Sequence, residues 1–198
     1  MEHDTRWRSQ LGQDRFAWLT LDRKRDGTFI DIGAGEPETI SNTWTLETGF
    51  GWRGVLCDIE HAEQLRKLRN PSNDVEADAF AVDWRAHFRK WQRDGWIDFL
   101  SLDIEPPDMT AKLLLDLPLG EVKFRIACVE HDAYRFENGS QRRDLMRNLL
   151  EWHGYVRVCD VGCEVDGKHA HIEDWWVHSD AEDLVERAQL VLTGGGAI

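Results

Sequence analysis

The chain has 198 residues, the length of one domain, and its 37 acidic residues outnumber its 24 basic residues to give a formal net charge of −13. This charge repels phosphate backbones and anionic membrane surfaces, so neither nucleic acid nor a membrane is expected as a partner. Hydrophobic residues make up 41% of the chain, which suffices for a sizeable core. No apolar run reaches the roughly 20 residues that span a bilayer, and the first residues lack the apolar part of a signal peptide. We therefore expect one cytoplasmic domain over residues 1–198.

Short apolar runs alternate with segments of helical periodicity along the chain. The expected strands are residues 28–33, 54–58, 75–79, 97–103, 124–130, 155–159 and 175–178. The expected helices are residues 14–22, 41–48, 61–69, 84–93, 112–117 and 141–152. This alternation predicts a doubly wound α/β fold, in which helices cover both faces of a parallel sheet.

Several segments also predict which side chains are buried and which are not. The helix at 84–93 carries three aromatic residues at helical spacing, which we expect in the core: Trp84, Phe88 and Trp91. The last expected helix carries its large apolar residues on one face: Leu145, Leu149 and Trp152. The charged run 61–69 predicts a solvated helix face, and the glycine-rich residues 190–198 predict a flexible tail.

A glycine-containing turn follows the first expected strand, where the sequence from 31 to 37 is Asp-Ile-Gly-Ala-Gly-Glu-Pro. In a doubly wound sheet, ligands bind beyond the carboxyl ends of the strands, and glycines there let the backbone approach a ligand. Asp58 ends the second expected strand, 25 residues after Gly33, where a carboxylate can accept both hydroxyls of a ribose. Taken alone, the glycines could form a plain tight turn, and Asp58 could be a solvated strand end. Together the two features favour a nucleoside cofactor.

The residues around the turn distinguish between nucleoside cofactors. Position 38 holds Glu38 where a full GxGxxG would have glycine, and no GxxxxGK[ST] phosphate loop is present. Glu36 next to the glycines disfavours a pyrophosphate, and with it an NAD-type enzyme. An acidic loop suits a cationic or zwitterionic ligand, and S-adenosylmethionine carries a sulfonium and an amino group.

Segments in matching order over residues 9–178 resemble the FkbM-type methyltransferases. They are Ser9–Asp14, Phe29–Ala34, Ser41–Thr43, Gly51–Gly54, Asp98–Glu105 and Glu173–Val177. The resemblance implies a class I S-adenosylmethionine-dependent methyltransferase with a Rossmann-like sheet of seven strands, the last of them antiparallel, and a core of residues 9–178. The chain departs from the usual family pattern in having Asp58-Ile59 in place of Glu-Pro. It departs again after the fourth strand, where Pro106-Pro107 follows Glu105.

The resemblance also implies which residues bind the cofactor. Four positions of the glycine turn would line its methionine part: Asp31, Gly33, Ala34 and Gly35. Asp58 would bind the ribose. Three positions would contact the adenine or its edge: Ile59, Asp78 and Ala79. Four others would support the glycine turn or close the site from the N-terminal helix: Ser41, Asn42, Gln13 and Asp14.

Acidic residues and one histidine end the two strands expected on the acceptor side. Asp103 ends the fourth expected strand, Glu130 ends the fifth, and His131 follows Glu130. Neighbouring parallel strands lie about 4.8 Å apart, so these side chains can converge. Carboxylates and imidazole suit Mg²⁺ or Mn²⁺, which would activate an acceptor hydroxyl, with His131 as metal ligand or general base. The alternative is that these polar residues only hydrogen-bond to loops.

A second histidine motif, His169-Ala170-His171, lies in the expected connection between the last two strands. In an extended chain, both imidazoles face one side. They are candidates for substrate contact or for a transition-metal site, and a surface histidine pair is the alternative.

These features predict an S-adenosylmethionine-dependent methyltransferase that methylates a hydroxyl of a sugar or another small molecule. A catalytically silent cofactor-binding or scaffold protein of the same fold is the alternative. A DNA amino-methyltransferase needs an aromatic residue after Pro106-Pro107, and Asp108 stands there instead.

Overall fold

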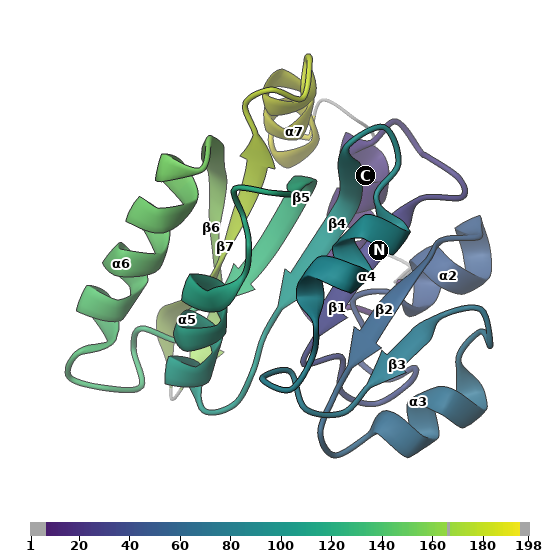
Figure 1. Ribbon diagram of the computed structural model, residues 1–198. Helices are drawn as coiled ribbons and strands as arrows, with labels where there is room; N and C mark the ends of the chain where they lie inside the picture. Colours follow the sequence, from purple (N-terminus) through teal and green to yellow (C-terminus); the bar gives the residue numbers. More distant parts are fainter. Residues whose placement is uncertain (1–6, 166, 195–198) are drawn as a thin grey trace.

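A computed structural model describes residues 7–165 and 167–194 of the chain (Figure 1). Seven strands form one sheet in the order β3-β2-β1-β4-β5-β7-β6. Their bounds are β1 Thr28–Ile32, β2 Arg53–Cys57, β3 Asp74–Glu76, β4 Trp96–Leu102, β5 Lys123–Glu130, β6 Tyr155–Val165 and β7 Lys168–His178. Strand β7 is antiparallel to both β5 and β6, while the other pairings are parallel. The expected seven-stranded sheet with an antiparallel last strand is therefore confirmed.

The helices lie on both faces of the sheet (Figure 1). Their bounds are α1 Gln13–Thr20, α2 Trp44–Phe50, α3 Ala62–Leu68, α4 Trp84–Trp91, α5 Pro107–Asp116, α6 Gly139–Trp152 and α7 Leu184–Leu192. One apolar core packs α4, α5 and α6 against one face, and a second packs α1, α2 and α7 against the other. Strands β1 and β4 are buried on both sides because helices cover both faces, which is why they are nearly continuous apolar runs. No helix within the described residues is both long and apolar enough to cross a bilayer.

The core predictions for two helices have different outcomes. Trp84, Phe88 and Trp91 are buried, as expected. On α6, by contrast, Met146 and Leu150 face the core. The expected apolar face is largely exposed there, since Leu145 is 48% and Trp152 is 86% exposed.

The C-terminal part differs most from the expectation. Strands β6 and β7 form a hairpin that is longer than the apolar runs 155–159 and 175–178, because polar residues on both strands continue the pairing. Helix α7 was not expected, and its last turn occupies the start of the expected tail at residues 190–192. Residues 195–198 of that tail lie outside the described residues.

Candidate functional site

Two cavities open at the carboxyl ends of β1, β2 and β4, with volumes of about 590 and 350 Å³. Four residues line both of them: Gly33, Gly35, His61 and Asp103. The order of the sheet places β2 on one side of β1 and β4 on the other, so successive strands are added on opposite sides of β1. Open α/β sheets bind their ligands at such a switch point.

The two glycines of the turn after β1 have different roles. Gly33 has a φ of +80°, and a Cβ on it would lie 1.5 Å from the carbonyl oxygen of Asp103. Any side chain at Gly33 would therefore push β4 away from β1. Gly35 has a φ of +61°, and a Cβ on it would have no neighbouring atom within 4 Å. Gly35 is the position at which the missing side chain leaves room for a ligand.

Asp58 holds the glycine turn against the loop after β2. Its Oδ2 accepts a hydrogen bond from the backbone N–H of Gly35 at 2.9 Å. Its Oδ1 accepts from the backbone N–H groups of Glu60 and His61 at 2.9 and 2.8 Å. Burial acts to raise the pKa of Asp58, but these hydrogen bonds outweigh it and leave the pKa below its usual value. Asp58 is thus an ionised carboxylate in the wall of the larger cavity.

The residues expected around an adenine all line the larger cavity: Ile59, Asp78 and Ala79. Ile59 is 75% exposed, and the next residue after Ala79, Phe80, is 41% exposed in the same wall. Phe80 escaped the sequence analysis, although an aromatic residue directly after an expected adenine-edge pair was a usable signal. The two exposed apolar side chains give this cavity a surface suited to a flat apolar ring.

Asp31 and Arg69 belong to a buried polar network beneath the turn. Asp31 lines the smaller cavity and accepts a hydrogen bond from Thr43 Oγ1 at 2.6 Å. Burial raises the pKa of Asp31, although Thr43 and the charge of Arg69 act in the opposite direction. The Arg69 guanidinium is buried and donates to Glu47 at 3.1 Å and to Thr43 at 3.0 Å. The expectation of a solvated run over 61–69 is therefore wrong at its last residue.

Ser41 and Asn42, expected to support the glycine turn, make different contacts in the loop before α2. Ser41 is buried, and its Oγ accepts from the backbone N–H of Trp44 at 3.2 Å, so it supports the loop before α2. Asn42 donates from Nδ2 to Ser101 Oγ at 3.0 Å and lines the smaller cavity. Its Oδ1 is buried without a hydrogen-bond partner in the described part of the chain. Asn42 therefore borders the smaller cavity, while its Oδ1 atom is itself buried.

The N-terminal helix reaches the site through Gln13. This side chain lines the smaller cavity, and its Nε2 donates to Glu173 Oε2 at 3.1 Å. Burial raises the pKa of Glu173 to about 7. Asp14, also expected at the site, lines neither cavity. Its carboxylate accepts from the Ser9 hydroxyl at 2.5 Å and holds the turn before α1.

Two carboxyl groups meet at the ends of β4 and β5. Asp103 lines both cavities and Glu130 lines the smaller one, and their side chains are hydrogen-bonded to each other. Burial raises the pKa of both groups, and the negative charge of Asp103 raises that of Glu130 further. The pair therefore keeps a proton at neutral pH, because two carboxylates this close cannot both ionise cheaply.

The structure separates His131 from this pair, so the expected cluster of Asp103, Glu130 and His131 is not formed. The backbone N–H groups of His131 and Asp132 both donate to Ile172 O, which turns the chain at the end of β5. His131 consequently faces the β6–β7 hairpin and lines neither cavity. The geometry therefore does not bring together the three expected metal ligands Asp103, Glu130 and His131, and His131 does not border the cavities as a base.

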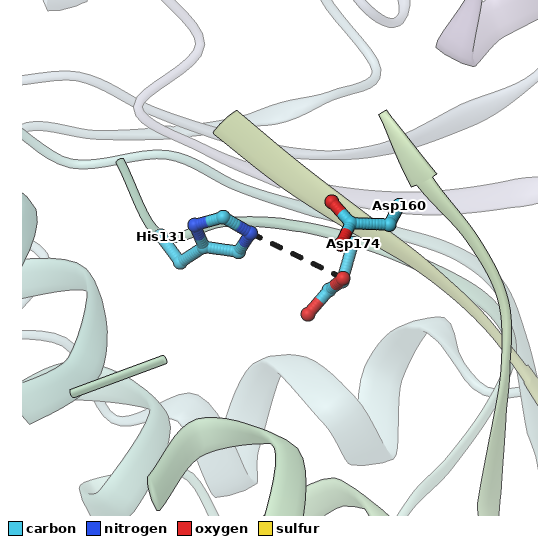
Figure 2. A group of neighbouring side chains, drawn as sticks. All are labelled: His131, Asp160 and Asp174. Atoms are coloured by element: carbon cyan, nitrogen blue, oxygen red, sulfur yellow. Dashed lines mark ion pairs between the residues drawn. The ribbon is translucent and has the colours of Figure 1, made fainter. Parts of the chain in front are cut away.

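Figure 2 shows where His131 lies instead, beside Asp160 of β6 and Asp174 of β7. Its Nδ1 accepts from the Ala133 N–H at 3.2 Å, and its Nε2 is 4.0 Å from Asp174 Oδ1. Burial lowers the pKa of His131 to about 4. Arg147 of α6 donates to both oxygens of Asp174 at 2.7 and 2.8 Å and to Asp160 at 2.9 Å. This group ties α6 to the hairpin.

A second acidic group lies on the outer side of Glu130. Carboxylate oxygens of Glu105, Glu130 and Asp132 all lie within 4.8 Å of one another. The Arg135 guanidinium bridges Glu105 and Asp132, with 2.7 Å to the latter. Arg135 was not predicted, because its sequence neighbourhood gives no motif and only the turn after β5 brings it to Glu105.

His169 and His171 lie on β7 and not in a connection between strands, which corrects the expectation. Their rings do share one side of the strand, with centroids 4.9 Å apart. His171 Nδ1 lies 3.0 Å from Asp160 Oδ1, and neither histidine lines a cavity. They are therefore not placed over the site.

No protein-family model and no curated protein sequence matches the chain. Several solved structures match the fold of the chain. The fibrillarin pre-rRNA processing protein of Methanococcus jannaschii aligns with a TM-score of 0.53 and 14% identity, over 78% of this chain and 67% of its own. An O-methyltransferase from Bacillus cereus in complex with SAH aligns with a TM-score of 0.52 and 11% identity, over 87% and 83%. The fold is that of the class I methyltransferases. At such identities the likeness shows the fold alone. Open α/β sheets bind ligands at the carboxyl ends of their strands, where both cavities lie.

Proposed function

We propose that the chain is an S-adenosylmethionine-dependent methyltransferase that methylates a hydroxyl group of a sugar or another small molecule. The observation that carries the proposal is the larger cavity, which lies over Gly35 and has Asp58 in its wall. The fold is shared with an O-methyltransferase that was solved with SAH, which supports the choice of cofactor.

The lining residues fit this cofactor. The empty space above Gly35 admits a ligand, and Asp58 is an ionised acceptor for ribose hydroxyls. No lysine or arginine lines either cavity, so nothing among the lining residues repels a sulfonium. When bound, the cofactor supplies a methyl group activated by that positive charge.

The acceptor chemistry then depends on Asp103, which lines both cavities and so borders the cofactor and the acceptor together. Transfer breaks the bond from sulfur to the methyl carbon and forms a bond from that carbon to the acceptor oxygen. The hydroxyl proton passes to the Asp103 carboxylate, while Glu130 keeps the proton of the pair. A positioned general base of this kind typically contributes 10²- to 10⁴-fold to the rate.

Calorimetry with S-adenosylhomocysteine tests the cofactor. Gly35→Ala places a methyl group in the cavity and should weaken binding at least tenfold, because it fills ligand space. Gly95→Ala is the matched control: it has a similar φ, +81°, has open space around its Cβ, and lies at the opposite end of β4. A substitution at Gly33 would not test ligand binding, since any side chain there would disturb β4 itself. Binding of NAD in place of S-adenosylhomocysteine would overturn the proposal. Binding without turnover on any hydroxyl would identify a silent cofactor-binding protein.

A further inference from the structure

His61 lies beside Asp58 and lines both cavities, although the proposed function gives it no role. We propose that His61 Nε2 accepts a hydrogen bond from one hydroxyl of the cofactor ribose, while Asp58 accepts from the other. The role of His61 rests on the proposed function, because it concerns the same cofactor.

The carboxylate of Asp58 has too little acceptor capacity for two hydroxyls. An ionised carboxylate offers about four lone-pair sites on its two oxygens. Its Oδ1 already accepts from the backbone N–H groups of Glu60 and His61, and the ring of His61 lies 3.0 Å from the same oxygen. Its Oδ2 accepts from the backbone N–H of Gly35. The capacity that remains is on Oδ2, where it suffices for one ribose hydroxyl and not for a second.

The contact with Asp58 determines which nitrogen of His61 is left to a ligand. Asp58 is ionised and can only accept, so the proton of a neutral imidazole lies on Nδ1, which donates to Asp58 Oδ1. Nε2 then carries a lone pair, and it makes no hydrogen bond within the part of the chain that the structure describes. A hydroxyl that donates to Nε2 would complete the hydrogen bonding of the ring.

The position of His61 suits this role better than that of the rival acceptor, Glu60. His61 directly precedes α3, its side chain is 26% exposed, and both its backbone and its ring bind Asp58. It lines the same two cavities as Gly35, whose missing side chain leaves room for a ligand. Glu60 is exposed and lines the larger cavity only. A side chain that is already held in place loses less conformational freedom when a ligand binds.

The two acceptors together would select a ribose with both hydroxyls free. A deoxyribose leaves one of the acceptors without its donor, which costs affinity. A phosphate on either hydroxyl would bring a negative charge to the Asp58 carboxylate.

Calorimetry with S-adenosylhomocysteine and with its 2′-deoxy and 3′-deoxy forms tests this role. His61→Asn keeps an amide N–H that can donate to Asp58 but has no group at the position of Nε2. This variant should bind S-adenosylhomocysteine about 2- to 10-fold more weakly than wild type does, as expected for the loss of one hydrogen bond to a neutral group. The deoxy form that lacks the hydroxyl bound by His61 should bind to variant and wild type equally. The other deoxy form should lose as much affinity as S-adenosylhomocysteine does.

His153→Asn, at the end of α6 and outside both cavities, is the matched control and should leave all three affinities unchanged. Equal weakening of all three ligands by His61→Asn would mean that His61 only supports Asp58, and it would overturn the proposal. An unchanged affinity for S-adenosylhomocysteine would overturn it as well. A selective loss in Glu60→Gln that His61→Asn does not show would assign the hydroxyl to Glu60 instead. Wild type that binds no S-adenosylhomocysteine would overturn the proposed function together with this role, whereas the other outcomes concern His61 alone.

Discussion

The two halves of the site are built differently. The half at the ends of β1, β2 and β3 rests on a buried network in which Arg69, Glu47, Thr43 and Asp31 bind one another. The half at the ends of β4 and β5 contains crowded carboxyl groups that hold a proton and an exposed arginine. The first half is held together by a buried arginine, while the second half depends on a shared proton and on Arg135 at its surface.

The largest expected effect tests the chemical role of the second half. Asp103→Asn keeps the shape of the pair but removes the base, so turnover should fall 10²- to 10⁴-fold while affinity for S-adenosylhomocysteine stays within a few fold. His131→Gln is the comparison, because His131 lines neither cavity. Steady-state kinetics check both variants. If His131→Gln loses as much turnover as Asp103→Asn, the assignment of the base is wrong.

The next effect tests the rigidity of the first half. Arg69→Met leaves Glu47 buried without its cation and should lower the free energy of unfolding by about 3–5 kcal/mol. Lys67→Met on the same helix is the control: its side chain is 73% exposed, so we expect a change within about 0.5 kcal/mol. Urea denaturation measures both. Similar stabilities of the two variants would mean that this network does not hold the first half.

A third effect concerns Glu173 of β7, which accepts a hydrogen bond from Gln13. Its pKa is about 7 in the folded protein against an ordinary value of 4.5, so the folded state binds more protons between these values. The free energy of unfolding should therefore fall as pH rises through this window, by at most about 1.4 kcal/mol per pH unit from this group. Urea denaturation of wild type and Glu173→Gln at each pH gives the difference in the free energy of unfolding, and this difference isolates the contribution of Glu173. A difference that is independent of pH from 4 to 8 contradicts the prediction.

The smallest effect is on cofactor affinity. Asp58→Asn removes the charge that faces the ribose and also weakens the hydrogen bond from Gly35, so S-adenosylhomocysteine should bind about tenfold more weakly. Asp116→Asn at the end of α5, outside both cavities, is the control. Calorimetry that gives equal affinities for both variants would remove Asp58 from the cofactor site.

The first half of the site could be predicted from the sequence because parallel strands deliver their last residues to one edge. Asp31 lies near the end of the first buried strand, and Gly35 and Asp58 follow the first and second strands closely, so the end of each strand located these residues. Arg69 escaped prediction, since a charged residue in a charged run gives no sign of its burial. Burial there depends on Glu47 and Thr43, which are more than 20 positions away in sequence.

The second half and the C-terminal hairpin were predicted less well, for a geometrical reason. A strand pattern shows where β5 ends, but not to which side the chain turns after Glu130, and that turn sends His131 toward Asp174. On α6, one residue of rotation decides whether Leu145 or Met146 faces the core. Both choices depend on tertiary packing, which periodicity does not encode.

The position of β7 between β5 and β6 has a consequence for the synthesis of the chain. Residues Ile126–Glu130 of β5 pair with β7, so this apolar edge has no partner until the residues of β7, up to Val177, have been made. At about 5–20 residues per second, the 47 residues from His131 to Val177 take about 2–10 s. During that time an unpaired β edge is a template for aggregation. A ribosome that stalls in this interval therefore carries the form of the chain that most needs a chaperone.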